Sequence, residues 1–195
     1  MARRMNGLIR CVAPSAALLI LLAQGAAVAE PGRDATGAPS PAGCGVSLLK
    51  DQDYFPALLE GIRLARHEIA LSAFFFKTMG TGSSQPELVL THLLEAARRG
   101  VRVEAVVESG PGGDNVSRDN EETAKRLKKG GIRVCLDAPD RTAHAKLVVI
   151  DRRYLFIGSH NLTQSALKYN HEVSVRIDSP RLAEEALAYL KSLCP

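Results

Sequence analysis

The feature that most limits what this chain can fold into is the alternation of helix-type and strand-type segments between residues 58 and 193. Apolar residues recur with helical spacing in some segments, whereas others are short apolar runs bounded by glycine, proline or polar residues. Such alternation is typical of an α/β fold, and we expect a mixed β-sheet flanked by helices on both faces. The expected helices are 58–65, 86–99, 121–129 and 180–193, and the expected strands are 69–76, 101–107, 132–136, 146–150, 154–157 and 171–177.

The first 43 residues have a different character. A basic head is followed by an apolar stretch too short to span a bilayer and then by Ala27-Val28-Ala29, the pattern of a signal-peptidase site. We therefore expect residues 1–29 to be a secretory signal, with an uncleaved anchor as the alternative. Residues 30–43 are rich in Pro, Gly and Ala and predict a flexible leader, and residues 44–195 predict a single catalytic domain. The mature protein is then secreted or periplasmic, without stable membrane insertion.

The net charge of this chain does not indicate which kind of partner it binds. Signal cleavage removes three of the 25 basic residues, Arg3, Arg4 and Arg10, and none of the 21 acidic ones, which leaves a charge of about +1. The sequence pI of about 9.0 therefore overstates how basic the mature protein is. Any argument for an anionic substrate must come from local clusters.

Three cysteines remain after the signal: Cys44, Cys135 and Cys194. An oxidising compartment permits one disulfide among them. Cys44 and Cys194 lie at the two ends of the predicted domain, and the termini of compact domains are often close. We expect these two to pair, and we expect Cys135, in an apolar strand, to be a core residue.

The residues with the clearest chemical pattern lie between positions 144 and 161. His144 and Lys146 lie two apart in or next to a predicted strand, so both side chains point to the same face. Ser159 and Asn161 repeat this spacing after the next strand. Six specified residues at fixed spacing occur by chance in a chain of this length with odds of about three in a million. They are His144, Lys146, Asp151, Gly158, Ser159 and Asn161.

This pattern resembles the HKD motif of the phospholipase D superfamily. The resemblance covers nearly the whole predicted domain and is greatest to small secreted bacterial endonucleases. It implies a phospholipase D-like fold and a phosphodiesterase that needs no metal or other cofactor. The sequence itself contains no C-x-x-C or H-E-x-x-H spacing that favours a zinc site.

The resemblance also implies roles for individual residues. His144 is the expected nucleophile, which attacks phosphorus and forms a phosphohistidine. Lys146 and Asn161 are expected to hold the phosphoryl oxygens, and Ser159 to add a hydroxyl contact. Glu172, in Asn170-His171-Glu172, matches the acidic residue that orients the histidine, in its own subunit or in another.

Two residues of the motif have expected structural roles. Asp151 lies seven residues after His144, at the far end of the strand, so we expect a salt bridge or a turn contact there. Gly158 is expected to let the backbone approach a neighbour closely.

The mechanism requires two histidines, one as nucleophile and one as general acid, but the chain has one motif. The other four histidines outside it lack a lysine two positions later, and we interpret them as surface or helper residues. They are His67, His92, His160 and His171. Single-motif members pair two chains across a two-fold axis, so we expect a homodimer with the active site at the interface.

The sequence does not decide the substrate, but we expect an endonuclease that hydrolyses DNA or RNA, with phospholipase D activity on a phospholipid headgroup as the alternative. A basic group that includes Lys125, Lys128 and Lys129 favours DNA or RNA, although a solvated helix face is the commoner explanation of such a group. The apolar segment 74–79 and the export signal favour a phospholipid, although a buried strand explains the phenylalanines more simply. A non-catalytic phosphate-binding envelope protein is a third possibility, against which the intact motif argues.

Overall fold

The computed structural model describes residues 45–80, 82–110, 114–136 and 141–194. The proposed signal and leader, together with Cys44, lie outside these residues. No helix in the described part combines the length and the apolar character needed to cross a bilayer.

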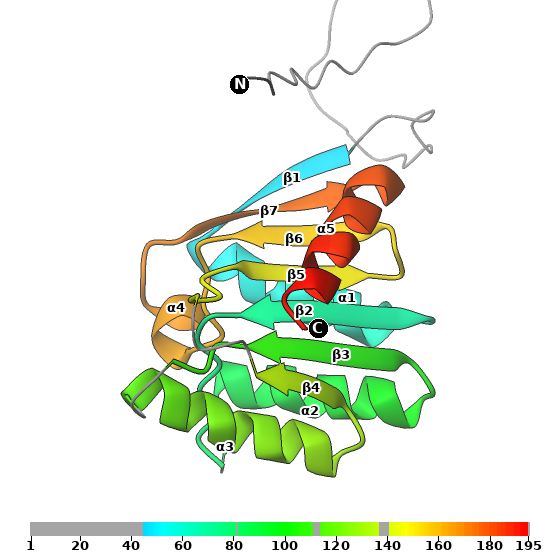
Figure 1. Ribbon diagram of the computed structural model, residues 1–195. Helices are drawn as coiled ribbons and strands as arrows, with labels where there is room; N and C mark the ends of the chain where they lie inside the picture. Colours follow the sequence, from blue (N-terminus) through cyan, green and yellow to red (C-terminus); the bar gives the residue numbers. More distant parts are fainter. Residues whose placement is uncertain (1–44, 81, 111–113, 137–140, 195) are drawn as a thin grey trace, which may run out of the picture. The chain divides into compact units, whose positions relative to one another are not determined.

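The centre of the fold is one seven-stranded mixed sheet in the order β1-β7-β6-β5-β2-β3-β4 (Figure 1). Strands β2, β3 and β4 are parallel to one another, whereas the remaining neighbours are antiparallel. The strands are β1 Gly45–Lys50, β2 Glu68–Ala73, β3 Arg102–Val107, β4 Arg133–Leu136, β5 Lys146–Ile150, β6 Tyr154–Gly158 and β7 Val173–Asp178.

Helices cover both faces of the sheet, which confirms the predicted fold class. One face packs against α1, α2 and α3 through a core that includes Leu58, Leu93 and Leu127, with the short α4 beside it. On the other face, α5 is the helix that packs among the described residues, through Leu187 and Leu190 on Leu147 and Val149. The helices are η1 Asp51–Asp53 (a 3-10 turn), α1 Tyr54–Leu64, α2 Gln85–Arg98, α3 Asn115–Lys129, α4 Gln164–Lys168 and α5 Pro180–Ser192.

Helix α3 begins six residues before the predicted start at residue 121. Asp114 caps it by accepting a hydrogen bond from the Ser117 amide. Its first turns bury the polar residues Ser117, Asn120 and Thr123, so this half of the helix lacks the apolar spacing that reveals helices in a sequence.

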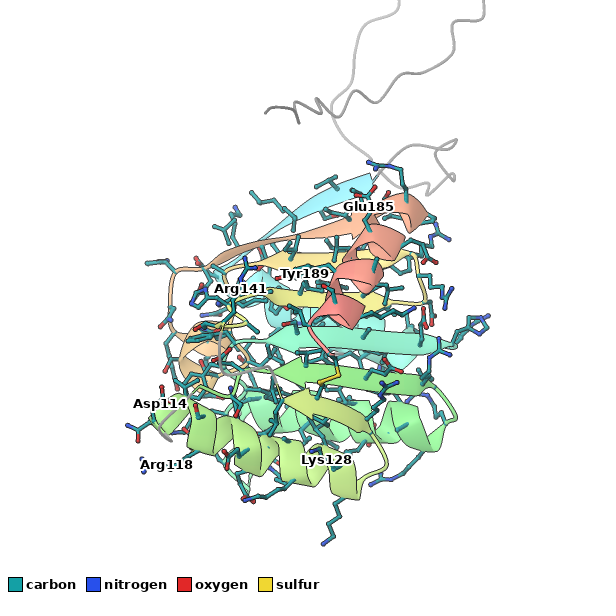
Figure 2. The ribbon with its side chains drawn as sticks, viewed as in Figure 1. Asp114, Arg118, Lys128, Arg141, Glu185 and Tyr189 are labelled. Carbon is teal, nitrogen blue, oxygen red and sulfur yellow. A yellow bond between two sulfur atoms is a disulfide. The ribbon has the colours of Figure 1, made fainter. Side chains whose placement is uncertain are left out.

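The predicted pairing of Cys44 with Cys194 is wrong. The disulfide joins Cys135 to Cys194, with Cα atoms 5.9 Å apart, and Figure 2 shows it between β4 and the end of α5. Cys135 lies opposite Val106 on the face that α5 covers, and α5 crosses that face to end beside it. The bond therefore fastens the last helix to the β4 edge of the sheet.

Candidate functional site

Chain direction in the sheet brings the motif residues to one edge. Strands β2 and β6 end there, and the antiparallel strands β5 and β7 begin there. His144 precedes β5, Ser159 follows β6, and Glu172 precedes β7. We call this side of the sheet the site edge; in Figure 1 it is where the arrowheads of β2, β3 and β6 lie.

His144 and Lys146 form a close pair at the site edge. Lys146 Nζ donates to the His144 carbonyl oxygen at 2.9 Å and lies 3.3 Å from His144 Nδ1. Partial burial lowers the pKa of the Lys146 ammonium, and the negative charge of Glu172 opposes this change. The pair thus offers an exposed imidazole beside a poorly hydrated cation, a combination suited to a phosphate group.

Phe74 supports this pair, and sequence reasoning missed it. Its ring lies 4.3 Å from the His144 ring, centroid to centroid, and Lys146 Nζ lies 4.8 Å from its centroid. Strand β2 ends at Ala73, directly opposite Lys146, so the next residue reaches the site instead of continuing a buried strand. Of the three successive phenylalanines, only Phe76 is fully buried.

Two buried polar residues fix the segments that carry Phe74 and His144. Asn120, fully buried, donates to the carbonyl oxygens of Phe74 and Glu108 and accepts from the Phe76 amide. Glu108, also buried, accepts from the amide of Ala143, the residue before His144. Because buried polar groups that are fully bonded hold one geometry, these contacts determine how the site edge is arranged.

Ser159 and Glu172 meet on the next two strands. The Ser159 hydroxyl donates to the Glu172 carboxylate and accepts from the Val173 amide at 3.1 Å. Asn170 Nδ2 donates to the other Glu172 oxygen at 3.1 Å. Glu172 therefore contacts Ser159, and no direct contact with His144 of the same chain is recorded among the described residues.

Asp51, a second residue that sequence reasoning missed, fixes Glu172 from η1, directly after β1. Its amide donates to the Glu172 carbonyl oxygen, and its carboxylate accepts from the Glu172 amide at 2.9 Å. This backbone hydrogen bond, followed by one from His171, lowers the pKa of Asp51. A lone acidic residue more than a hundred positions from its partner gives no local sequence signal.

Asn161 lies next to Lys146 and completes the site. Both residues line a cavity of about 10 Å³, enough for about one water molecule. The Asn161 side-chain oxygen is buried, and no hydrogen-bond partner is recorded for it in the described part of the chain. This oxygen is an acceptor, so a phosphoryl oxygen beside Lys146 would have to accept from the Nδ2 group of Asn161.

Of the two interpretations that the sequence left for His160, surface or helper residue, the structure excludes the surface one. It is 2% exposed, and its ring stacks on Tyr54 at 4.3 Å between centroids. Its Nδ1 lies 2.7 Å from Ser174 Oγ, and its Nε2 lies 2.9 Å from the Asp51 carbonyl oxygen. Burial lowers its pKa. The ring therefore packs and orients the site from inside the fold.

Gly158 and Asp151 have the kinds of contact that their positions in the motif led us to expect. A Cβ atom on Gly158 would lie 2.5 Å from the Val173 carbonyl oxygen, so β6 approaches β7 too closely for a side chain. Asp151, at the opposite end of β5 from His144, accepts from the amides of Arg66, His67 and Glu68. It fastens the start of β2 to the β5–β6 turn.

Replacement of Asp151 by asparagine is expected to reduce the free energy of unfolding by about 1–3 kcal/mol, because three amides lose a charged acceptor. Asparagine tolerates the positive φ of 52° at this position, so the change removes the charge and one of the two accepting oxygens without backbone strain. Urea unfolding measures the loss.

The pH dependence provides a control for this variant. The backbone hydrogen bonds outweigh desolvation and lower the pKa of Asp151 in the folded state. Its contribution is therefore complete above the unfolded pKa of about 3.9 and is lost as pH falls through the lower folded value. The difference between wild type and Asp151→Asn must shrink in that range; a constant difference would contradict this role.

The predicted substrate lysines do not lie at the site edge. Lys125, Lys128 and Lys129 lie on the last turns of α3, whose end leads into the start of β4. The start of β4 lies at the edge opposite to His144, because β4 is parallel to β2 and β2 is antiparallel to β5.

Comparison with known proteins identifies the family of this chain. The sequence profile described as "Cardiolipin synthase, PLD-like domain" matches residues 58–194. A mitochondrial cardiolipin hydrolase from Mus musculus is 29% identical over 69% of this chain and 55% of its own length. A phospholipase D from Rickettsia prowazekii is 31% identical over 62% of this chain and 55% of its own length. The chain thus spans about half the length of these two relatives.

Solved structures share the fold. The phospholipase D family member Nuc from Salmonella typhimurium has a TM-score of 0.66 and 23% identity over 77% of this chain and 94% of its own. NucT from Helicobacter pylori has a TM-score of 0.63 and 21% identity over 77% of this chain and 96% of its own. With the sequence profile, this fold shows that the chain belongs to the phospholipase D superfamily of phosphodiester-cleaving enzymes.

Proposed function

We propose that this chain is an exported phosphodiesterase that cleaves DNA or RNA through a phosphohistidine on His144 and needs no metal ion. The observation that carries the proposal is the pairing of His144 with Lys146 on Phe74, at the edge where Ser159, Asn161 and Glu172 also lie. The site supplies a nucleophile, a cation and hydrogen-bond donors for one phosphate group.

The proposed reaction has two displacements at phosphorus. A His144 ring nitrogen bonds to phosphorus as the bond to the leaving oxygen breaks, and a second histidine gives that oxygen a proton. Water then attacks phosphorus and breaks the nitrogen–phosphorus bond, and the second histidine takes a proton from this water. Lys146 and Asn161 bind the non-bridging oxygens in both steps.

We assign the second histidine to another copy of this chain, because the described part of this chain places no second exposed histidine beside His144. His160 is buried with both ring nitrogens in contact with protein groups. His171 is fully exposed and contacts Asp51. Two copies of His144 that share one phosphate satisfy the chemistry.

An exposed apolar strip next to the site fits this dimer. Leu48 of β1 and Ile157 of β6 both lie opposite Val175 of β7, so their side chains share one face of the sheet. Val173 and Val46 continue that face, and the four exposed side chains have exposed fractions between 41% and 60%. Val173 follows Glu172 directly, so a copy docked on this strip lies beside the site.

A phospholipid is the alternative substrate, and the Rickettsia prowazekii phospholipase D and the Mus musculus cardiolipin hydrolase favour it. We rank nucleic acid first because the exposed His144 and Ser159 suit a polymer that lies across an open edge.

The test offers the purified mature protein single-stranded DNA, duplex DNA, RNA and phosphatidylcholine vesicles side by side, in EDTA. We expect cleavage of nucleic acid and not of lipid. Cleavage of lipid alone would overturn the substrate assignment, and strict dependence on added metal would overturn the mechanism.

A further inference from the structure

Three helix–strand junctions lie side by side at the edge of the sheet opposite to the site edge. Helices α1, α2 and α3 each lead into one of the strands β2, β3 and β4. Because these strands are parallel neighbours, the three helices end at the same edge, as Figure 1 shows. We call this edge the basic edge because of the side chains that follow.

Each junction contributes two or three basic residues, and all eight are exposed. Figure 2 shows one of them, Lys128, which extends from the end of α3. The eight are Arg63 and Arg66 at the first junction, Arg98, Arg99 and Arg102 at the second, and Lys128, Lys129 and Arg133 at the third.

Contacts between the junctions show that the basic residues form one surface. Arg99 Nη2 donates to the carbonyl oxygens of Ile62 and Arg63, at 3.1 and 3.2 Å, and so joins the second junction to the first. Arg133 of the third junction lies 3.6 Å from Glu104, which follows the second. The three basic junctions are therefore in contact with one another in the folded protein.

Three described carboxylates lie among these residues, and each already has partners. Glu68 pairs with Arg102 and with Arg152 of the β5–β6 turn, and Glu104 pairs with Arg133. Asp151 accepts from the backbone amides of Arg66, His67 and Glu68. The other six basic residues have no ion pair within the described part of the chain. Their six positive charges are more than the formal net charge of +4 of the whole protein. These residues are Arg63, Arg66, Arg98, Arg99, Lys128 and Lys129.

Helix dipoles do not account for this concentration. A basic residue stabilises a helix only within its last turn, and one such residue per helix is enough for the effect. Here Arg66, Arg102 and Arg133 lie beyond the helix ends. Exposed like charges gathered at one edge create a positive potential that attracts anions.

We propose that the basic edge is an accessory binding surface for the phosphate backbone of nucleic acid, distinct from the site that cleaves it. This inference rests on the proposed function, because it assigns the same substrate class. An anionic membrane is disfavoured since Leu64 is the one exposed large hydrophobic residue recorded at the three junctions, and none there is aromatic.

The distance between the two edges sets the length of nucleic acid required. Strand β2 has six residues and therefore spans about 20 Å. A duplex advances about 3.4 Å per base pair, so about six base pairs separate a phosphate at His144 from one at the basic edge. Binding of substrates shorter than this is expected not to depend on the basic edge, whereas binding of longer substrates is expected to depend on it.

The experiment reverses one charge at each junction, in the triple variant Arg66→Glu, Arg98→Glu, Lys129→Glu. Binding to a duplex of about 30 base pairs is measured against salt concentration in a His144→Ala background, so that no cleavage occurs. Loss of three phosphate contacts is expected to reduce the slope of log K against log salt by about 3. Arg181→Glu, on α5, is the single-charge control and is expected to leave the slope unchanged.

A long and a small substrate distinguish a failure of the basic-edge proposal from a failure of the proposed active site. With His144 present, the triple variant is expected to cleave the long duplex at least tenfold less efficiently and bis(p-nitrophenyl) phosphate at the wild-type rate. An unchanged salt slope would overturn the proposal, as would a loss of binding to anionic vesicles while DNA binding persists. If charge reversal prevents folding, the matching glutamine variant is expected to give the same change in slope.

Discussion

Replacement of His144 by alanine is expected to abolish cleavage of DNA and of bis(p-nitrophenyl) phosphate, with a loss of about 10³-fold or more. The imidazole is the proposed nucleophile, and it is the described histidine that contacts Lys146, whereas His160 and His171 contact Ser174 and Asp51. Because His144 is exposed and makes few contacts, the variant should fold like the wild type. Steady-state hydrolysis in EDTA measures the effect.

Two controls make this result specific. His92→Ala removes a histidine on α2 whose ring nitrogen pairs with Glu95, and it should leave the rate unchanged. Quenching a reaction with labelled DNA in denaturant should trap a protein–DNA adduct in the wild type and none in His144→Ala. A variant that retains full activity, or an adduct that survives the substitution, would refute the assigned nucleophile.

The second large effect concerns stability. Replacement of Cys135 and Cys194 by serine is expected to lower the free energy of unfolding by about 4 kcal/mol, because the bond closes a long loop with a sequence separation of 59 residues. It also fastens α5, the only helix described on its face of the sheet, to β4. Urea unfolding of the double variant and of reduced wild type should give similar losses.

A matched substitution separates this pairing from the one expected from the ends of the domain. Cys44→Ser should keep the Cys135–Cys194 bond and the unfolding midpoint. If Cys44→Ser instead destabilises the protein as much as the double variant, the observed pairing does not hold in solution.

The sequence alone predicted the sheet well, since most strands are apolar runs and the main helices have clear apolar spacing. Three segments without such signals were missed: α4, the first turns of α3 and β1. Helix α4 has only five residues, and the first turns of α3 bury Ser117, Asn120 and Thr123. Strand β1 pairs only with β7, at the exposed end of the sheet, and its residues are mostly exposed.

Some contacts at the site could be predicted from the sequence and others could not. His144 and Lys146 are only two residues apart in the chain, so the sequence predicted that they lie close together. Phe74, Asn120 and Asp51 reach the site from distant parts of the chain. Only the pairing of β2 with β5 and of β1 with β7 brings Phe74 and Asp51 there, and no local pattern encodes those pairings.

The most direct test of the account asks whether one active site requires two copies of His144. Wild type and His144→Ala are unfolded together in equal amounts, refolded so that subunits mix at random, and assayed on DNA, whose leaving oxygen needs a proton. Sites built from two histidines predict about one quarter of the wild-type activity, because only one dimer in four has both. About one half would contradict the account, since it means that each chain carries a complete site.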